Sequence, residues 1–316
     1  HDDGLEALEA RLAEVFPAPA ALVFGSGYLA NVAVVTALAG DDALIVSDAA
    51  SHASAIDACR LARATVRVVD VCDDEALAHA LKDADAFRRV LVLVLGVPSM
   101  GAPPRPLDAI VSRAEAAGAW VIVDDAHGLG TVGPGGRGTA AAHGVADRVA
   151  VQVGNLGKAL GSYGAFVLCG QATRELLVQK SRPFVFTCSL PPGVVAAAEA
   201  GVQQLGEAPE LPRRLQQHAA ELRRQLAAHG VPALDVGDVS VAEARGLLSP
   251  VIPVPVGDPR DAVALAEGLL ERGWFVPAVR PPTVPAGASQ LRLTVNVQHE
   301  PEQLSGVAQA LAEARA

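Results

Sequence analysis

The sequence has few aromatic residues, no long hydrophobic run and fewer basic than acidic residues. Only 3% of the 316 residues are aromatic although 51% are hydrophobic, so the core must consist mainly of alanine, valine and leucine. No apolar run approaches the ~20 residues needed to cross a bilayer, and no charged-then-apolar leader opens the chain. We therefore expect an unsecreted, cytoplasmic protein that does not enter a membrane.

The formal net charge of −10 argues against a generally basic surface, so we expect neither nucleic acid nor anionic membranes as partners. Any phosphate-bearing ligand must then be held by local donors. The cysteines show no C-x-x-C pair and no metal-ligand spacing. We expect no metal site, and thiols that stay reduced as in the cytosol.

Short apolar runs alternate with helical patterns over the first two-thirds of the chain. The expected strands are 21–24, 43–46, 65–71, 90–95, 120–123, 149–153 and 165–168, with helices at 29–38, 54–62, 74–81 and 107–117 between them. This alternation predicts an α/β domain with parallel strand pairing. Two long helical patterns follow, and then a small α+β arrangement with expected strands at 274–279 and 291–297. We therefore place the domains at 1–207 and 208–316.

Two segments carry the strongest chemical signal. Residues 121–128 read VIVDDAHG, so an apolar run ends in Asp124 and His127 follows; residues 154–161 read GNLGKALG and place Lys158 among glycines after another apolar run. A lysine at the mouth of an α/β sheet suits Schiff-base chemistry, and an aspartate at a neighbouring strand end can keep a pyridine nitrogen protonated. Together they indicate a pyridoxal phosphate (PLP) enzyme.

The glycine-rich turn at residues 25–30 leaves an alternative open. Its sequence GSGYLA matches the dinucleotide fingerprint G-x-G-x-x-A, and Asp41, Asp42 or Asp48 lies near the distance of the ribose-binding acid. An NAD-dependent dehydrogenase is therefore a competing reading, although the same turn can aim its N–H groups at a single phosphate. The segment around Lys158 is not a nucleotide P-loop, because Ala159 offers magnesium no hydroxyl.

With these motifs assembled, the chain resembles the α-oxoamine synthases, a fold-type I PLP family, from its first residues to its last. The resemblance rests on segments 26–31, 51–54, 123–128, 157–161 and 182–184, and most specifically on 280–287 with 291–294. It implies a PLP-dependent transferase of fold type I, with a large mostly parallel-sheet domain and a small C-terminal α+β domain. It also implies a homodimer with interface sites that condenses an amino acid with an acyl-CoA or acyl-ACP.

The resemblance further implies a role for each matching residue. Lys158 would bind the cofactor and move protons at the substrate α-carbon, Asp124 would pair with the pyridine nitrogen, and His127 would hydrogen-bond the ring hydroxyl. His52 would stack on the ring. Arg292 would bind the amino-acid carboxylate, a bidentate match that lysine cannot provide. The remaining expected cofactor contacts are Ser26, Gly27, Tyr28, Ser99, Asn155 and Cys188.

Several positions depart from the family pattern. Leu95 stands where an acid is usual, Asn155 replaces a hydroxyl residue and Cys188 replaces a threonine. The last two positions normally serve the phosphate, Cys188 across a dimer interface. Asn155 can still donate a hydrogen bond, whereas cysteine is a weak donor. The family's substrate-binding N-terminal segment is expected to be missing, since the chain opens on a helical pattern at 4–15.

Overall fold

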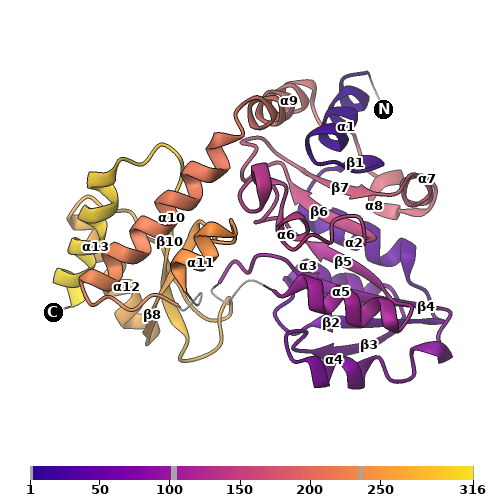
Figure 1. Cartoon of the computed structure of the whole chain (residues 1–316), viewed down its shortest axis with the longest axis horizontal. Helices are drawn as coiled ribbons and strands as arrows, with labels where there is room; N and C mark the ends of the chain where they lie inside the picture. Colours follow the sequence, from indigo (N-terminus) through magenta and orange to yellow (C-terminus); the bar gives the residue numbers. More distant parts are fainter. Residues whose placement is uncertain (1–2, 101–104, 235–237, 316) are drawn as a thin grey trace. The chain divides into compact units, whose positions relative to one another are not determined.

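The computed structural model describes residues 3–100, 105–234 and 238–315. The chain divides into two compact units, whose elements are labelled in Figure 1: the first consists of His1–Val97 and Arg105–Pro209, the second of Pro98–Pro104 and Glu210–Ala316. The second unit thus includes a short stretch that begins at Pro98, which the sequence did not indicate. The domain limits 1–207 and 208–316 stay a prediction.

A seven-stranded sheet forms the centre of the first unit, in the order β1-β7-β6-β5-β4-β2-β3. Its strands are β1 (Ala20–Phe24), β2 (Ala43–Asp48), β3 (Thr65–Val69), β4 (Arg89–Leu95), β5 (Trp120–Asp124), β6 (Val151–Asn155) and β7 (Ala165–Cys169). The strands from β6 to β3 pair in parallel, which confirms the mostly parallel sheet. Strand β7 is antiparallel to both β6 and β1, because residues 156–164 join β6 to β7 without the helical crossover that parallel pairing needs.

Helices cover both faces of this sheet (Figure 1). They are α1 (Asp3–Val15), α2 (Gly27–Leu38), α3 (Ala53–Leu61), α4 (Asp74–Ala80), α5 (Leu107–Ala116), α6 (Thr139–Ala142), α7 (Gln171–Lys180), α8 (Arg182–Val185) and α9 (Pro192–Glu207), with 3-10 turns η1 (Ala84–Ala86) and η2 (Pro134–Gly136). Successive strand side chains point to opposite faces, so Ile45 and Ile122 pack with α2 and α3 while Val46 and Val123 pack with α4 and α5. The near-continuous valine and leucine runs therefore fill two cores at once.

The second unit packs four helices with a small antiparallel sheet of order β8-β10-β9. Its elements are α10 (Glu210–Ala228), α11 (Val239–Ala244), β8 (Val251–Gly257), α12 (Pro259–Glu271), β9 (Ala278–Val279), β10 (Ser289–Thr294) and α13 (Pro301–Arg315). The strand expected at 274–279 shrinks to two residues, because Pro277 has no N–H to donate to a ladder. No helix among the described residues of either unit is long and apolar enough to span a bilayer.

Candidate active site

Six strands of the large sheet, all except β7, end at one edge. Strands β2, β4, β5 and β6 are parallel and finish at Asp48, Leu95, Asp124 and Asn155. Strand β1 points the same way as β6, because two antiparallel pairings through β7 cancel, and it leads to Ser26. Ligands of open α/β sheets bind outside this carboxyl edge. The strand order therefore gathers residues that lie far apart in the sequence.

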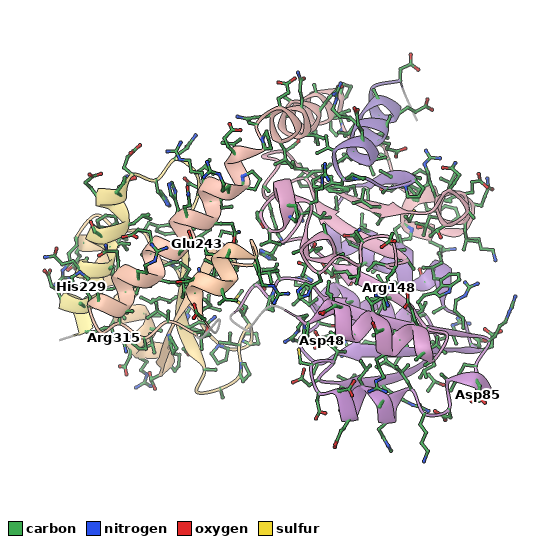
Figure 2. The ribbon with its side chains drawn as sticks, in the orientation of Figure 1. Asp48, Asp85, Arg148, His229, Glu243 and Arg315 are labelled. Atoms are coloured by element: carbon green, nitrogen blue, oxygen red, sulfur yellow. The ribbon has the colours of Figure 1, made fainter. Side chains whose placement is uncertain are left out.

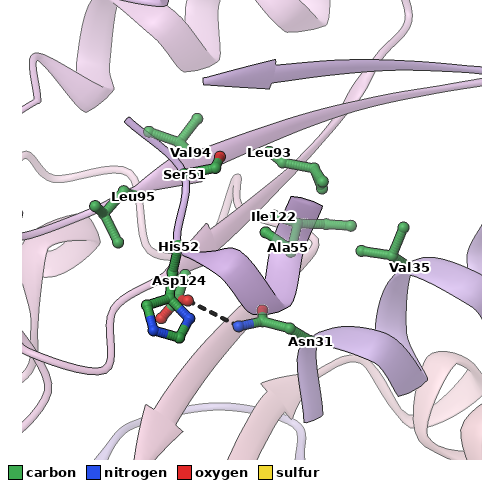
Figure 3. Close-up of a pocket in the computed structure, with 10 residues that line it drawn as sticks. All are labelled: Asn31, Val35, Ser51, His52, Ala55, Leu93, Val94, Leu95, Ile122 and Asp124. Carbon is green, nitrogen blue, oxygen red and sulfur yellow. Dashed lines mark hydrogen bonds between the residues drawn. The ribbon is translucent and has the colours of Figure 1, made fainter. Parts of the chain in front are cut away.

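A pocket lies at this edge, and Figure 3 shows its lining side chains. Asn31, His52 and Asp124 supply polar atoms, while Leu93 and Leu95 are among the apolar side chains that line it. The structure thus brings His52 and Asp124, which the sequence assigned to one site, into one pocket. Leu95 lines this pocket with an apolar side chain, at a position where the family pattern predicts an acid.

The first turn of α2 has donors that could hold an anion. Ser26 caps the helix by accepting a hydrogen bond from the Leu29 N–H at 3.2 Å, which leaves its own hydroxyl hydrogen available. The N–H groups of Gly27 and Tyr28 lead the helix, where backbone donors and the helix dipole favour a negative charge. The Tyr28 hydroxyl instead donates to Asp57 Oδ2 at 3.0 Å, which raises the pKa of Tyr28. The ring of Tyr28 is thereby tied to α3.

Asn155 points a second donor at the first turn of α2. Its Oδ1 accepts the Gly157 N–H at 2.7 Å, so its Nδ2 is turned the other way. A Cβ added to Gly27 would lie 3.3 Å from that Nδ2. The Asn155 amide therefore faces the start of α2, with a glycine leaving the space between them open. These contacts support the expected phosphate-binding role of Asn155 and Gly27.

Asp124 is half-buried and engages donors with both carboxylate oxygens. Oδ2 accepts from Asn31 Nδ2 at 2.8 Å and Oδ1 accepts from the Ala126 N–H at 3.2 Å. The next residue, Asp125, is fully buried and bonded to Thr139, and its burial raises its pKa to about 6. Of the two adjacent acids, only Asp124 is therefore exposed toward a ligand.

His52 is exposed at the start of α3. Its Nδ1 accepts the Ser54 N–H at 3.2 Å and lies 2.8 Å from the Ser54 hydroxyl. Both of these contacts are made to Nδ1, so they hold the ring by that edge. This leaves a face for the stacking contact that the resemblance implies.

His127 and Lys158 lie on two loops that touch. His127 is half-buried in the turn after β5, and Lys158 is exposed in the loop after β6. A Cβ on Gly130 would come 2.6 Å from the Cβ of Ala159, so a glycine with φ of +89° lets the two loops pack. Adjacent pairing of β5 with β6 and this loop contact support the proposed grouping of Asp124, His127 and Lys158.

The other expected site residues are placed less directly. Cys188 lies in the exposed stretch between α8 and α9. Ser99 and Arg292 belong to the second unit, so their approach to Asp124 stays a prediction. Arg292 on β10 has a buried Nε without a hydrogen-bond partner among the described residues, and burial lowers its pKa. An unpaired buried guanidinium atom suits an anionic ligand.

The structure argues against the hypothesis that the glycine-rich turn at residues 25–30 binds a dinucleotide. A dinucleotide fold places β1 beside β2, whereas here β1 lies at the far end of the sheet, next to β7. Asp48, labelled in Figure 2, ends β2, but its buried carboxylate is bound by Arg105 through Nε at 3.0 Å and a second nitrogen at 3.2 Å. One of the three acids expected near a ribose, Asp48, is therefore already paired with Arg105.

Comparison with known proteins agrees with this geometry. A model of the family described as aminotransferase class I and II matches residues 2–311. The chain belongs to this family. It is 44% identical to the 8-amino-7-oxononanoate synthase of Anaeromyxobacter dehalogenans, over 97% of this chain and 74% of that protein. A serine palmitoyltransferase structure from Sphingomonas wittichii has a TM-score of 0.91 at 34% identity, covering 99% of this chain and 76% of that one. A structure of SPT with PLP has a TM-score of 0.90 at 32% identity, covering 99% and 77%.

Asn31 and Ser54 belong to the motif segments 26–31 and 51–54, but the sequence predicts no role for either. Both are buried and both contact site residues. Asn31 has a signal in the sequence, a polar side chain near the start of the mostly apolar helical run 29–38, whereas Ser54 has none. Among the described residues, no group of three His, Cys, Asp or Glu side chains is arranged to hold a metal.

Proposed function

We propose that this protein condenses L-alanine with a pimeloyl thioester, on CoA or on acyl carrier protein, to give 8-amino-7-oxononanoate in biotin biosynthesis. The reaction is PLP-dependent and releases carbon dioxide. The observation that carries the proposal is the placement of Asp124 at the end of β5 and of Lys158 just after the adjacent parallel strand β6, in a chain 44% identical to a named 8-amino-7-oxononanoate synthase. The segment 280–287 with 291–294 supports the same subfamily.

The donor set fits PLP. The first turn of α2 and the Asn155 amide offer donors to a phosphate, and the missing side chain of Gly27 leaves room for it. Asp124 offers a carboxylate to a protonated ring nitrogen, held by Asn31 and the Ala126 N–H. PLP, when bound, supplies an electron sink that makes the α-proton of an amino acid removable.

Each site residue then has a defined task. The Lys158 amine binds the cofactor covalently and afterwards moves the proton at the substrate α-carbon. The charge of Asp124 favours a protonated ring nitrogen, since an opposite charge stabilises the charged form. His127 donates to the ring hydroxyl, and His52 covers one ring face and excludes water. Arg292 binds the substrate carboxylate through its unpaired Nε and the rest of its planar guanidinium.

The active form is proposed to be a homodimer. Cys188 lies with Thr187 and Ser189 in an exposed stretch, as expected for a segment that completes the phosphate site of a second subunit. Ser99 is proposed to contact the cofactor from the second unit. The cytoplasmic location stays a prediction.

A second candidate is a sister synthase that uses serine and a longer acyl thioester. It is favoured by the solved structures, because serine palmitoyltransferases match the fold over 99% of the chain. The test offers the PLP-loaded protein alanine, serine or glycine, each with pimeloyl-CoA, pimeloyl-ACP or palmitoyl-CoA, and measures product mass and released carbon dioxide. We expect product only from alanine with a pimeloyl donor. Product from serine with palmitoyl-CoA would establish the second candidate, and no product from any pair would refute both.

A further inference from the structure

Two buried polar side chains, Asn31 and Ser54, connect Asp124 with His52. Asn31 Nδ2 lies 2.8 Å from Asp124 Oδ2 and 2.9 Å from Ser54 Oγ, and Ser54 Oγ lies 2.8 Å from His52 Nδ1. Figure 3 shows the Asn31–Asp124 bond beside the His52 ring. Asn31 is 4% exposed and Ser54 1% exposed, so water cannot substitute freely for either. Three elements, α2, α3 and β5, are thereby joined at the strand edge.

In this series of hydrogen bonds, the donor and the acceptor of each bond can be assigned by starting from Asp124 at one end and His52 at the other. An ionised carboxylate only accepts, so the amide of Asn31 must turn its NH2 toward Asp124. The second hydrogen of that NH2 goes to Ser54 Oγ, which therefore accepts from Asn31 and donates its own hydrogen to His52 Nδ1. The Ser54 N–H also points at Nδ1, at 3.2 Å. Facing two donors, Nδ1 carries no hydrogen, and the proton of the neutral ring is on Nε2.

We infer that Asn31 and Ser54 are positioning residues of the cofactor site, which set the carboxylate of Asp124 and the tautomer of His52 together. The expected effect on catalysis rests on the proposed function, whereas all four side chains of the series lie within the first unit. Asn31 keeps one oxygen of Asp124 bound, while the Ala126 N–H binds the other. Ser54 makes His52 present its Nε2–H outward. Neither Asn31 nor Ser54 needs to touch the substrate to act.

The first test reads the His52 tautomer in the cofactor-free protein. Imidazole ¹⁵N shifts distinguish the two neutral tautomers, and the His52 signals are assigned by their loss in His52→Gln. We expect the Nε2–H form in the unmodified protein and a mixture of tautomers in Ser54→Ala, where only the backbone donor remains. An Nδ1–H ring in the unmodified protein would overturn the inference without any variant. Unchanged shifts in Ser54→Ala would overturn it as well.

The second test follows exchange of the alanine α-proton with deuterated water, without an acyl donor. Asn31→Ala should slow exchange by roughly 10–100-fold, the range for partners that orient a functional group, while PLP binding weakens less. Thr36→Val is the matched control, because Thr36 lies on α2 but bonds only the Val32 carbonyl of its own helix. Equal exchange in the two variants would overturn the role of Asn31. No exchange in the unmodified protein would instead count against the proposed function, while the tautomer test still stands.

Discussion

Asp124 and Asp125 are adjacent at the end of β5, yet their carboxylates lie in opposite surroundings. Asp124 faces the pocket and is bonded to Asn31. Asp125 has no exposed surface, and both of its oxygens accept from Thr139 at 2.6 Å, one from the N–H and one from the hydroxyl. A Cβ added to Gly128 would lie 1.9 Å from Asp125 Oδ1. The first acid is available for chemistry, and the second is enclosed by the backbone.

Asp124→Asn should therefore bind PLP but lose catalysis. Without the charge beside it, the ring nitrogen is no longer kept protonated, and the α-proton of alanine is no longer acidified. Exchange of that proton should fall by at least about 100-fold, as for removal of a key electrostatic group. Asp125→Asn is the control, because its side chain cannot reach the cofactor. Equal losses in the two variants would mean that Asp124 is not the ring-nitrogen partner.

The buried carboxyl of Asp125 predicts a pH-dependent stability. Burial raises its folded-state pKa to about 6 from an ordinary 3.8, so the folded protein holds this proton more tightly than the unfolded chain. Its contribution to the free energy of unfolding is complete below about pH 4 and is lost as the pH rises through about 6. The loss amounts to at most about 3 kcal/mol, at ~1.4 kcal/mol per pKa unit.

Urea unfolding of the cofactor-free protein between pH 4 and 7.5 measures this effect. Other carboxyls titrate in the same range, so the quantity to follow is the difference between the unmodified protein and Asp125→Asn. Asparagine is neutral and can keep both Thr139 contacts: its oxygen accepts the Thr139 N–H, and its NH2 donates to the Thr139 hydroxyl oxygen. We expect the unmodified protein to lose stability relative to the variant as the pH rises. A constant difference would show that Asp125 does not titrate in this range.

The sequence predicts the large sheet well because its strands are buried on both faces. Runs such as 90–95 and 120–123 have no polar residue before their ends, so length and composition alone identify them. The reversal of β7 was not foreseen, since a strand's direction depends on how the chain returns and not on its own residues. The strand at 274–279 was overestimated for a local reason, the proline at 277.

The site could be predicted only as far as each residue has its own signal. Lys158 and Asp124 stand out because a charged residue follows an apolar run. Asn31 and Ser54 have no such signal, because their importance comes from pairings with Asp124 and His52 that exist only after α2, α3 and β5 have packed. Arg292 was recognised by resemblance, whereas its unpaired Nε is visible only in the structure.

Gly130 should be intolerant of a side chain. Gly130→Ala combines an unfavourable φ of +89° with a Cβ 2.6 Å from that of Ala159, and so pushes the His127 loop from the Lys158 loop. Gly135→Ala is a matched control, since its φ is +60° and nothing lies within 4 Å. The strain common to both is about 1–2 kcal/mol. Gly130→Ala should cost more free energy of unfolding and also weaken PLP binding, and adding Ala159→Gly should recover part of both losses. Equal effects of the two single variants would contradict the proposed loop contact.

Lys158 should be the residue that carries the cofactor. The chain contains only three lysines, Lys82, Lys158 and Lys180, so the assignment can be decided completely. Reduction of the PLP-loaded protein with borohydride, followed by peptide mapping, should place the pyridoxyl group on Lys158. Lys158→Ala should lose the label, while Lys82→Ala and Lys180→Ala should keep it. A label on either of the other lysines would refute the assignment.

Cys188 should limit phosphate binding across the dimer. Sedimentation should show a dimer if, as proposed, a second subunit completes each cofactor site, and a fully active monomer would disprove shared sites. Cysteine is a weaker donor than the hydroxyl residue expected at this position, so Cys188→Thr should tighten PLP binding by about 1 kcal/mol. Cys72→Thr is the control, an exposed cysteine beside Arg105 that is outside the proposed site. Unchanged affinity in Cys188→Thr would mean that the phosphate is held without this segment, by Asn155 and the first turn of α2.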